Sequence, residues 1–166
     1  MAALVTGKLA PDFTLPTLDG KQVSLHDLRQ RGPVVLAFFK VTCPVCQYAF
    51  PMYERMAQAH KNSGATFLGV SQNKPADAKA FIRDYSVTFP VAIDDEANNF
   101  AVSSAYGLTN VPTLFYIAPD GEIEVSSVGW SKLDVEGVNA KLAALRNQKP
   151  NVLWRLGESI QEFRAG

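Results

Sequence analysis

The stretch VVLAFFKVTCPVC, residues 34–46, holds both cysteines of the 166-residue chain and decides how the surrounding sequence is expected to fold. Its first eight residues, 34–41, form a nearly unbroken apolar run, which is typical of a strand buried on both faces of a parallel sheet. A helical pattern begins at the cysteines, so we expect Cys43 at a helix N-terminus and Pro44 in the first turn. Cys46 then follows one turn later on the same face, within reach of the first sulfur.

Two cysteines at this spacing, at a strand-to-helix junction, predict a redox site. The unpaired N–H groups and the dipole of a helix N-terminus would stabilise a thiolate at Cys43. The alternatives are half of a zinc site or an inert buried pair. A structural zinc site needs four ligands, and the histidines, His26 and His60, are not at ligand-like spacings. We therefore favour redox chemistry that needs no metal and no cofactor.

Composition predicts one compact domain over residues 1–166, because 47% of the residues are hydrophobic and the chain is long enough for a sizeable core. The sixteen lysine and arginine residues balance sixteen aspartate and glutamate residues, and no basic cluster occurs. This balance argues against binding to nucleic acid or to an anionic membrane. The expected partners are proteins or small molecules.

The first residues, MAALVTGKLAPDF, lack the charged and apolar regions of an export signal, and no run of about 18 apolar residues follows. The chain as written is therefore predicted to be cytoplasmic. If an export signal had been removed, the location would instead be periplasmic or otherwise extracytoplasmic.

Before the central strand, residues 13–15 and 22–24 flank the turn-forming pair Asp19-Gly20 and predict a hairpin. Ser24 is expected to cap a short helix over residues 25–29. After the cysteines, an apolar stripe predicts a helix that packs on the core and is bent at Pro51. Residues 65–70 then predict a second buried strand, joined to the first by a right-handed crossover.

The second half of the chain predicts a helix opened by Pro75, a short strand over residues 91–93, and a helix that begins near an acidic run at 94–96. Residues 113–117 and 122–128 predict an antiparallel hairpin, and Ser131 is expected to cap the next helix. A last amphipathic helix is expected over about residues 150–164, docked on the domain by default or on a second copy, and in the second case it would form a homodimer. Its apolar side would hold Val152, Leu153, Leu156, Ile160 and Phe163.

This order of elements, with Cys-x-x-Cys after the first buried strand, resembles the thioredoxin fold. Asn110-Val111-Pro112-Thr113 looks like the cis-proline loop of that family, which lies against the Cys-x-x-Cys turn and pairs with the substrate backbone. Residues 10–28 resemble the start of the AhpC/TSA and TlpA-like branch, and the likeness covers about residues 8–146. The resemblance implies an α/β fold, a three-layer α/β/α sandwich with an N-terminal β-hairpin, an inserted helix and the extra C-terminal helix.

Three positions depart from the pattern of these relatives. Thr42 stands where thioredoxin-like enzymes usually carry a tryptophan. Ala37 replaces the buried aspartate of thioredoxin, and Ala49 replaces the glutamate of many TlpA-like proteins. The usual route for the proton of the second cysteine is therefore missing.

The favoured function is a thiol-disulfide oxidoreductase in which Cys43 attacks a substrate disulfide and Cys46 resolves the mixed disulfide. The substrates would be protein or small-molecule disulfides, and an upstream thiol would be the reductant. The resemblance implies a substrate groove formed by Val111 and Pro112 together with Thr42 and Pro44.

Three alternatives stay open. A thiol peroxidase keeps the AhpC/TSA likeness, but the matching positions of the peroxidase signature P-x-x-x-T/S-x-x-C are Leu36 and Lys40 before Cys43, and neither fits. A metal-binding module of thioredoxin fold would need a third ligand, and no histidine follows His60. A redox-inactive interaction domain is the third alternative, against which the paired cysteines argue.

Overall fold

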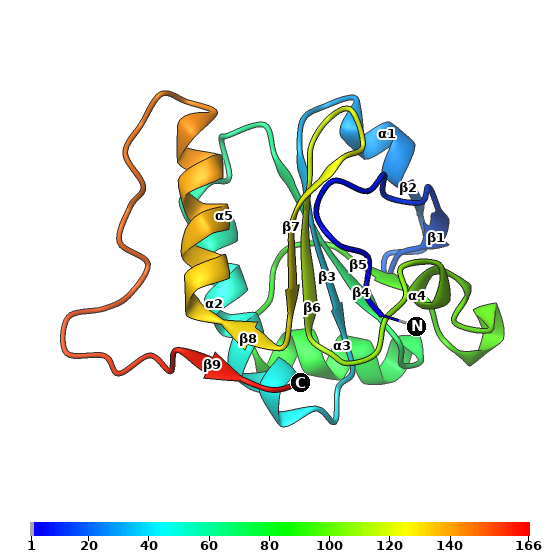
Figure 1. Ribbon diagram of the computed structural model, residues 1–166. Coiled ribbons are helices and arrows are strands. Elements are labelled where there is room, and N and C mark those ends of the chain that lie inside the picture. The colour runs from blue at the N-terminus through cyan, green and yellow to red at the C-terminus, as the bar shows by residue number, and fades with distance from the viewer. Residues whose placement is uncertain (1) are drawn as a thin grey trace.

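The computed structural model describes residues 2–166 and is built around a five-stranded mixed sheet (Figure 1). The strand order is β5 (Val91–Ile93), β4 (Thr66–Ser71), β3 (Val34–Phe39), β6 (Thr113–Ile117) and β7 (Ile123–Val128). β3, β4 and β5 are parallel, whereas β6 is antiparallel to both β3 and β7. Every residue of β3 is buried, as its apolar run predicts for a central strand.

Helices cover both faces of this sheet, so the predicted α/β/α sandwich is confirmed. Figure 1 shows α2 (Pro44–Ala59) and α5 (Lys132–Ala144) on one side, and α4 (Ala101–Ala105) with the N-terminal hairpin on the other. α3 (Pro75–Asp84) lies on the α2 side, because Phe81 packs against Phe39 and Phe50 with ring centroids 4.8 and 5.4 Å away. On the opposite face, Phe38 packs against Tyr106.

The N-terminal segments protect both edges of the sheet. The hairpin of β1 (Thr14–Pro16) and β2 (Gln22–Ser24) lies beside β5, where Leu18 donates a backbone hydrogen bond to Val91. At the other edge, Gly7 donates to Ile123 of β7. An uncovered edge would present unpaired backbone groups to other chains, so these contacts oppose edge-to-edge association.

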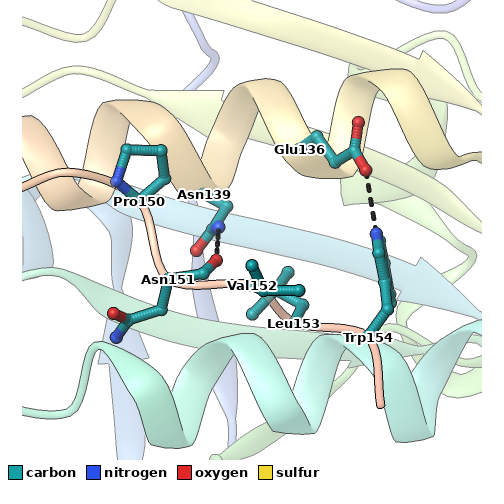
Figure 2. Close-up of a pocket in the computed structure, with 7 residues that line it drawn as sticks. All are labelled: Glu136, Asn139, Pro150, Asn151, Val152, Leu153 and Trp154. Atoms are coloured by element: carbon teal, nitrogen blue, oxygen red, sulfur yellow. Dashed lines mark hydrogen bonds between the residues drawn. The ribbon is translucent and has the colours of Figure 1, made fainter. Parts of the chain in front are cut away.

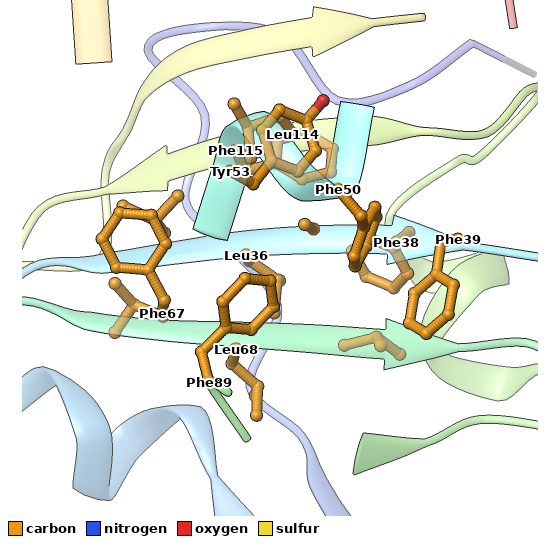
Figure 3. Packing of buried hydrophobic residues seen from close by; sticks show 14 of the residues in the cluster. Leu36, Phe38, Phe39, Phe50, Tyr53, Phe67, Leu68, Phe89, Leu114 and Phe115 are labelled. Atoms are coloured by element: carbon orange, nitrogen blue, oxygen red, sulfur yellow. The ribbon is translucent and has the colours of Figure 1, made fainter. Parts of the chain in front are cut away.

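Aromatic and aliphatic side chains pack on both faces of the sheet (Figure 3), and those on one face fill the space between the sheet and α2. Phe50 is fully buried and its ring contacts Phe39, Tyr53, Phe81 and Phe89. This one side chain therefore connects β3, α2, α3 and the segment before β5. Burying an aromatic side chain of this size stabilises a fold by about 1.5–3 kcal/mol relative to leaving it exposed.

The helix boundaries follow the predicted capping residues. Ser24 accepts a hydrogen bond from the Asp27 amide at the start of α1 (Leu25–Arg29), and Ser131 does the same for Asp134 in α5. Pro75 is the first residue of α3. In the acidic run, Asp95 caps the short 3-10 helix η1 (Glu96–Asn98), and buried Asp94 accepts hydrogen bonds from the amide and hydroxyl of Ser103. α2 continues through Pro51, at which the sequence predicts a bend.

The predicted C-terminal helix is wrong: residues 145–162 contain no helix, and only β8 (Trp130–Ser131) and β9 (Phe163–Arg164) pair near the end of the chain. Gly157 has φ +78°, which a right-handed helix does not allow. Carbonyl groups that would accept hydrogen bonds within a helix accept them instead from distant side chains. The Asn151 carbonyl oxygen accepts from the Asn139 side chain, and the Gln161 carbonyl oxygen accepts from the Trp130 indole. Leu153 is buried, whereas Val152 and Leu156 face solvent, so the predicted apolar residues do not pack together on the domain.

Across residues 2–166, none of the helices combines the length and apolarity required to span a membrane. The division into a core over about residues 8–146 and an extension after it stays a prediction.

Candidate active site

Cys43 lies at the carboxyl end of β3 and is the N-cap residue of α2. Its φ and ψ of −79° and 116° are extended, and the amide of Cys46 points at its sulfur with an N–Sγ distance of 3.4 Å. This amide is one of the orphan donors of the helix N-terminus, and such donors favour negative charge on the atom they face. The two cysteines therefore lie where the sequence places them, and both are free thiols.

The loop before β6 lies directly against this turn. The Val111–Pro112 peptide bond is cis, and the Cys43 thiol donates to the Val111 carbonyl oxygen at 3.3 Å. Asn110 shapes the loop, since its carbonyl oxygen accepts a hydrogen bond of 2.7 Å from the Thr113 hydroxyl. Residues 68 positions apart in the sequence thus meet at the sulfur of Cys43.

The two sulfurs differ in exposure. Cys43 is partly exposed, whereas Cys46 is completely buried. Burial is the main cause that raises the pKa of the Cys46 thiol far above its ordinary value of 9.0, because it penalises the thiolate. A hydrogen bond from the Lys40 main chain opposes this effect, and neighbouring Cys43 adds to it. Among the described residues, the groups that act on the pKa of Cys46 include no carboxylate.

Ala37 and Ala49 are both buried, and the resemblance places them where thioredoxin and many TlpA-like proteins, respectively, carry an acidic residue. Glu54 and Asp94 are buried carboxylates, but both are held by other partners. Glu54 accepts from the amide and hydroxyl of Thr88 at 2.6 and 3.0 Å, and Asp94 binds the first turn of α4.

The remaining predicted groove residues are Thr42 and Pro44, which are exposed on either side of Cys43, whereas Val111 and Pro112 are buried. Sequence reasoning missed the side chains that hold this turn. Asn73 accepts a hydrogen bond from the Val41 amide, and Gln47 donates to the Val41 carbonyl oxygen. No sequence pattern indicates these contacts, because asparagine and glutamine side chains are common on protein surfaces.

A small polar cavity of about 160 Å³ opens beside Val111. Lys40, which is exposed, lines it together with Gln72, Leu108, Thr109 and Asn110. The cavity borders Val111, whose carbonyl oxygen accepts a hydrogen bond from the Cys43 thiol.

The histidines lie elsewhere. His26 is exposed on α1, and His60 is buried at the end of α2, where its Nε2 lies 2.6 Å from Oδ1 of Asn139. His60 is therefore the buried C-cap residue of α2. Within residues 2–166 no three His, Cys, Asp or Glu side chains gather as ligands for one metal ion.

A larger pocket of about 280 Å³ lies away from the cysteines, between α5 and the C-terminal segment (Figure 2). Trp154 donates its indole N–H to Glu136, and Asn139 donates to the carbonyl oxygen of Asn151. These bonds attach the segment to α5, so the pocket is the space left between two packed elements.

Known proteins share this arrangement. The model of the AhpC/TSA family matches residues 6–126. The thiol-disulfide oxidoreductase ResA of Halalkalibacterium halodurans is 33% identical over 132 residues, which are 78% of this chain and 73% of that protein. The chain belongs to the AhpC/TSA family.

Solved structures agree with this membership. A putative thiol:disulfide interchange protein DsbE from Chlorobium tepidum is 30% identical with a TM-score of 0.74, over 86% of this chain and 99% of the other. The thioredoxin domain of a thiol-disulfide oxidoreductase from Bacteroides vulgatus is 25% identical with a TM-score of 0.75, over 84% and 98%. This AhpC/TSA protein therefore has a thioredoxin fold and is a TlpA-like thiol-disulfide oxidoreductase with a Cys-Pro-Val-Cys motif.

Proposed function

We propose that Cys43 is the attacking thiolate and Cys46 the resolving thiol of this oxidoreductase. The supporting observation is the difference between the sulfurs: Cys43 is partly exposed and faces the Cys46 amide, whereas Cys46 is buried beneath it. A substrate disulfide can approach the first sulfur and not the second.

The reaction then proceeds by two exchanges. The Cys43 thiolate attacks one sulfur of the substrate disulfide and releases the other as a thiolate, which leaves a mixed disulfide. Cys46 loses its proton and attacks the Cys43 sulfur, so the second substrate thiolate leaves and a Cys43–Cys46 disulfide forms. The substrate gains two electrons, and an upstream thiol reductant returns two electrons to the protein.

The groove for this substrate is formed by Val111 and Pro112 behind the sulfur and by Thr42 and Pro44 beside it. Support comes from the 3.3 Å contact between the Cys43 sulfur and the Val111 carbonyl oxygen, which puts the loop within reach of any group bonded to that sulfur. The proposed substrates are protein or small-molecule disulfides.

Reduction of insulin by the protein, with dithiothreitol as the reductant, tests the assignment. Cys43→Ser should abolish catalysis, and Cys46→Ser should stop turnover after the first exchange. If Cys43→Ser kept most of the activity, Cys46 would be the attacking thiol and Cys43 the resolving one.

The compartment and the oligomeric state are further predictions. The cytoplasm and an extracytoplasmic location are both proposed, and fractionation of the native host decides between them. A homodimer formed through the C-terminal segment would use exposed side chains such as Val152 and Leu156, since no helix forms there. Sedimentation analysis measures the state directly.

A further inference from the structure

The last six residues, 161–166, run back from the C-terminal segment to the active site, and we call them the strap. The strap is fixed first at Gln161, whose carbonyl oxygen accepts from the Trp130 indole at 2.7 Å and whose amide donates to the Tyr48 hydroxyl at 3.1 Å. β9 then pairs with β8, and the Lys132 amide donates to Glu162. Figure 1 shows this end of the chain beside the N-terminal end of α2.

Beyond β9 the strap reaches the loop that touches Cys43. The guanidinium of Arg164 lies over the Tyr48 ring, 5.0 Å from its centroid, and Tyr48 lies two residues after Cys46. The side-chain amide of Asn110 donates to the Gly166 main-chain oxygen at 2.9 Å. The strap is therefore bonded to α2 and to the loop before the cis peptide bond.

Two glycines allow this approach. Gly129, at φ +78°, donates its amide to Pro112, and a Cβ on it would lie 2.5 Å from the Arg164 carbonyl oxygen. A Cβ on Gly166 would lie 3.0 Å from the carbonyl carbon of Val111. Backbone thus packs on backbone at both positions, so no gap is left for an additional chain there.

The position of the strap matters because Val111 offers the backbone that a bound substrate would meet. Gly166 lies against the Val111 carbonyl group, and the cavity lined by Lys40, Gln72 and Thr109 also borders Val111. A long extended polypeptide crossing the groove would need the space that the strap fills. A compact disulfide entering from the Lys40 side would not.

We propose that the strap determines substrate specificity, by closing the α2–β8 side of the groove so that compact disulfides are preferred over extended polypeptide disulfides. This inference rests on the proposed roles of Cys43 and Cys46. It assigns a role to residues 161–166, a segment that lies outside the stretch matched by the family model.

Two variants loosen the strap to different degrees. Arg164→Ala removes the stacking on Tyr48, and deletion of residues 162–166 removes β9 and the contacts at Val111. Arg146→Ala is the matched control, because it removes an exposed arginine from the turn after α5. Circular dichroism first establishes that each variant is folded.

The readout is kcat/KM for insulin divided by kcat/KM for hydroxyethyl disulfide. The ratio should rise roughly tenfold in the deletion variant, rise less in Arg164→Ala, and stay at the wild-type value in Arg146→Ala. An unchanged ratio in both strap variants overturns the strap proposal alone. If the wild-type protein reduces neither insulin nor hydroxyethyl disulfide, that result overturns the proposed function instead.

Hydrogen exchange keeps the proposal testable if the deletion does not fold. In full-length Cys46→Ser, joining Cys43 to an extended peptide should deprotect the amides of residues 163–166, and joining it to 2-mercaptoethanol should not. Equal protection in the two mixed disulfides would contradict a strap that competes with polypeptide.

Discussion

The Cys46 thiol must lose a proton before it can attack the mixed disulfide. Burial raises the pKa of this thiol and so makes that step harder. The resemblance to thioredoxin and TlpA-like proteins implies a carboxylate at one of two positions, but Ala37 and Ala49 occupy them here. Water or hydroxide is therefore the expected proton acceptor. The resolving rate should increase with pH, since the raised pKa leaves the attacking thiolate scarce until the solution becomes alkaline.

Ala49→Glu should accelerate resolution near neutral pH by about 10²-fold, because a well-placed general base removes the proton. Single-turnover release from a Cys43 mixed disulfide, followed across pH, measures this rate. Ala59→Glu, an exposed position on the same helix, is the control and should leave the rate unchanged. An ionisation between about pH 6 and 8 that disappears when one native Asp or Glu is removed would show that the protein has its own base.

Peroxide should be at best a slow substrate. Leu36 and Lys40 occupy the proline and threonine or serine positions of the peroxidase signature before Cys43. Stopped-flow oxidation of the reduced protein by hydrogen peroxide measures the rate. A rate well above that of an ordinary thiolate would favour the peroxidase over the oxidoreductase.

These residues also show what sequence could and could not predict. The Cys-x-x-Cys turn and the loop at Val111 and Pro112 follow from local motifs, and the structure brings them together as predicted. The contacts of Asn73 and Asn110 depend on where distant segments meet, and that information is absent from the local pattern.

At the scale of elements, side chains of α2 and α5 attach the C-terminal segment to the domain. Arg55 of α2 bonds both carboxylate oxygens of Glu158, at 2.6 and 2.7 Å. The Arg55 guanidinium is the main cause that lowers the pKa of Glu158 from 4.5 to about 2, and the Arg155 amide adds to it. This pair is the central attachment between residue 150 and the strap.

A lowered carboxyl pKa means that the folded state favours the charged form, so the attachment is fully present above pH 4.5 and is lost as the pH falls toward 2. The backbone amide signal of Trp154 in nuclear magnetic resonance spectra should shift over this window as the segment detaches. Glu158→Gln should show the shifted signal already at neutral pH.

Glu162→Gln is the control for this experiment, because Glu162 is 82% exposed and pairs only loosely with Lys132. Its spectrum should keep the wild-type transition. A Trp154 signal that is indifferent to both pH and Glu158→Gln would show that the ion pair does not hold the segment.

The helix predicted for this segment failed for a physical reason. Its apolar spacing is compatible with a helix, but Gly157 is in the left-handed region and Asn139 and Trp130 bind its carbonyl groups. Tertiary hydrogen bonds therefore outweighed a weak local preference. The strands and the capped helices were predictable because their apolar runs and Ser caps act locally.

At the scale of the whole molecule, one aromatic core joins the sheet to the helix that carries the cysteines. Phe50→Ala should lower the free energy of unfolding by about 3–5 kcal/mol, because it leaves a cavity among four aromatic rings. Denaturant unfolding measures the loss. Leu133→Ala, at a side chain that is 75% exposed, should change stability by less than about 0.5 kcal/mol, and a similar loss in both variants would contradict the assigned core.

The central claim is that one exposed thiol attacks and one buried thiol resolves. Its most direct test is to mix each single-cysteine variant with a disulfide-bonded peptide and locate the bound peptide by mass spectrometry. Cys46→Ser should carry the peptide on Cys43 in nearly every molecule, and Cys43→Ser should carry almost none. A peptide trapped mainly on Cys46 of Cys43→Ser would contradict the account.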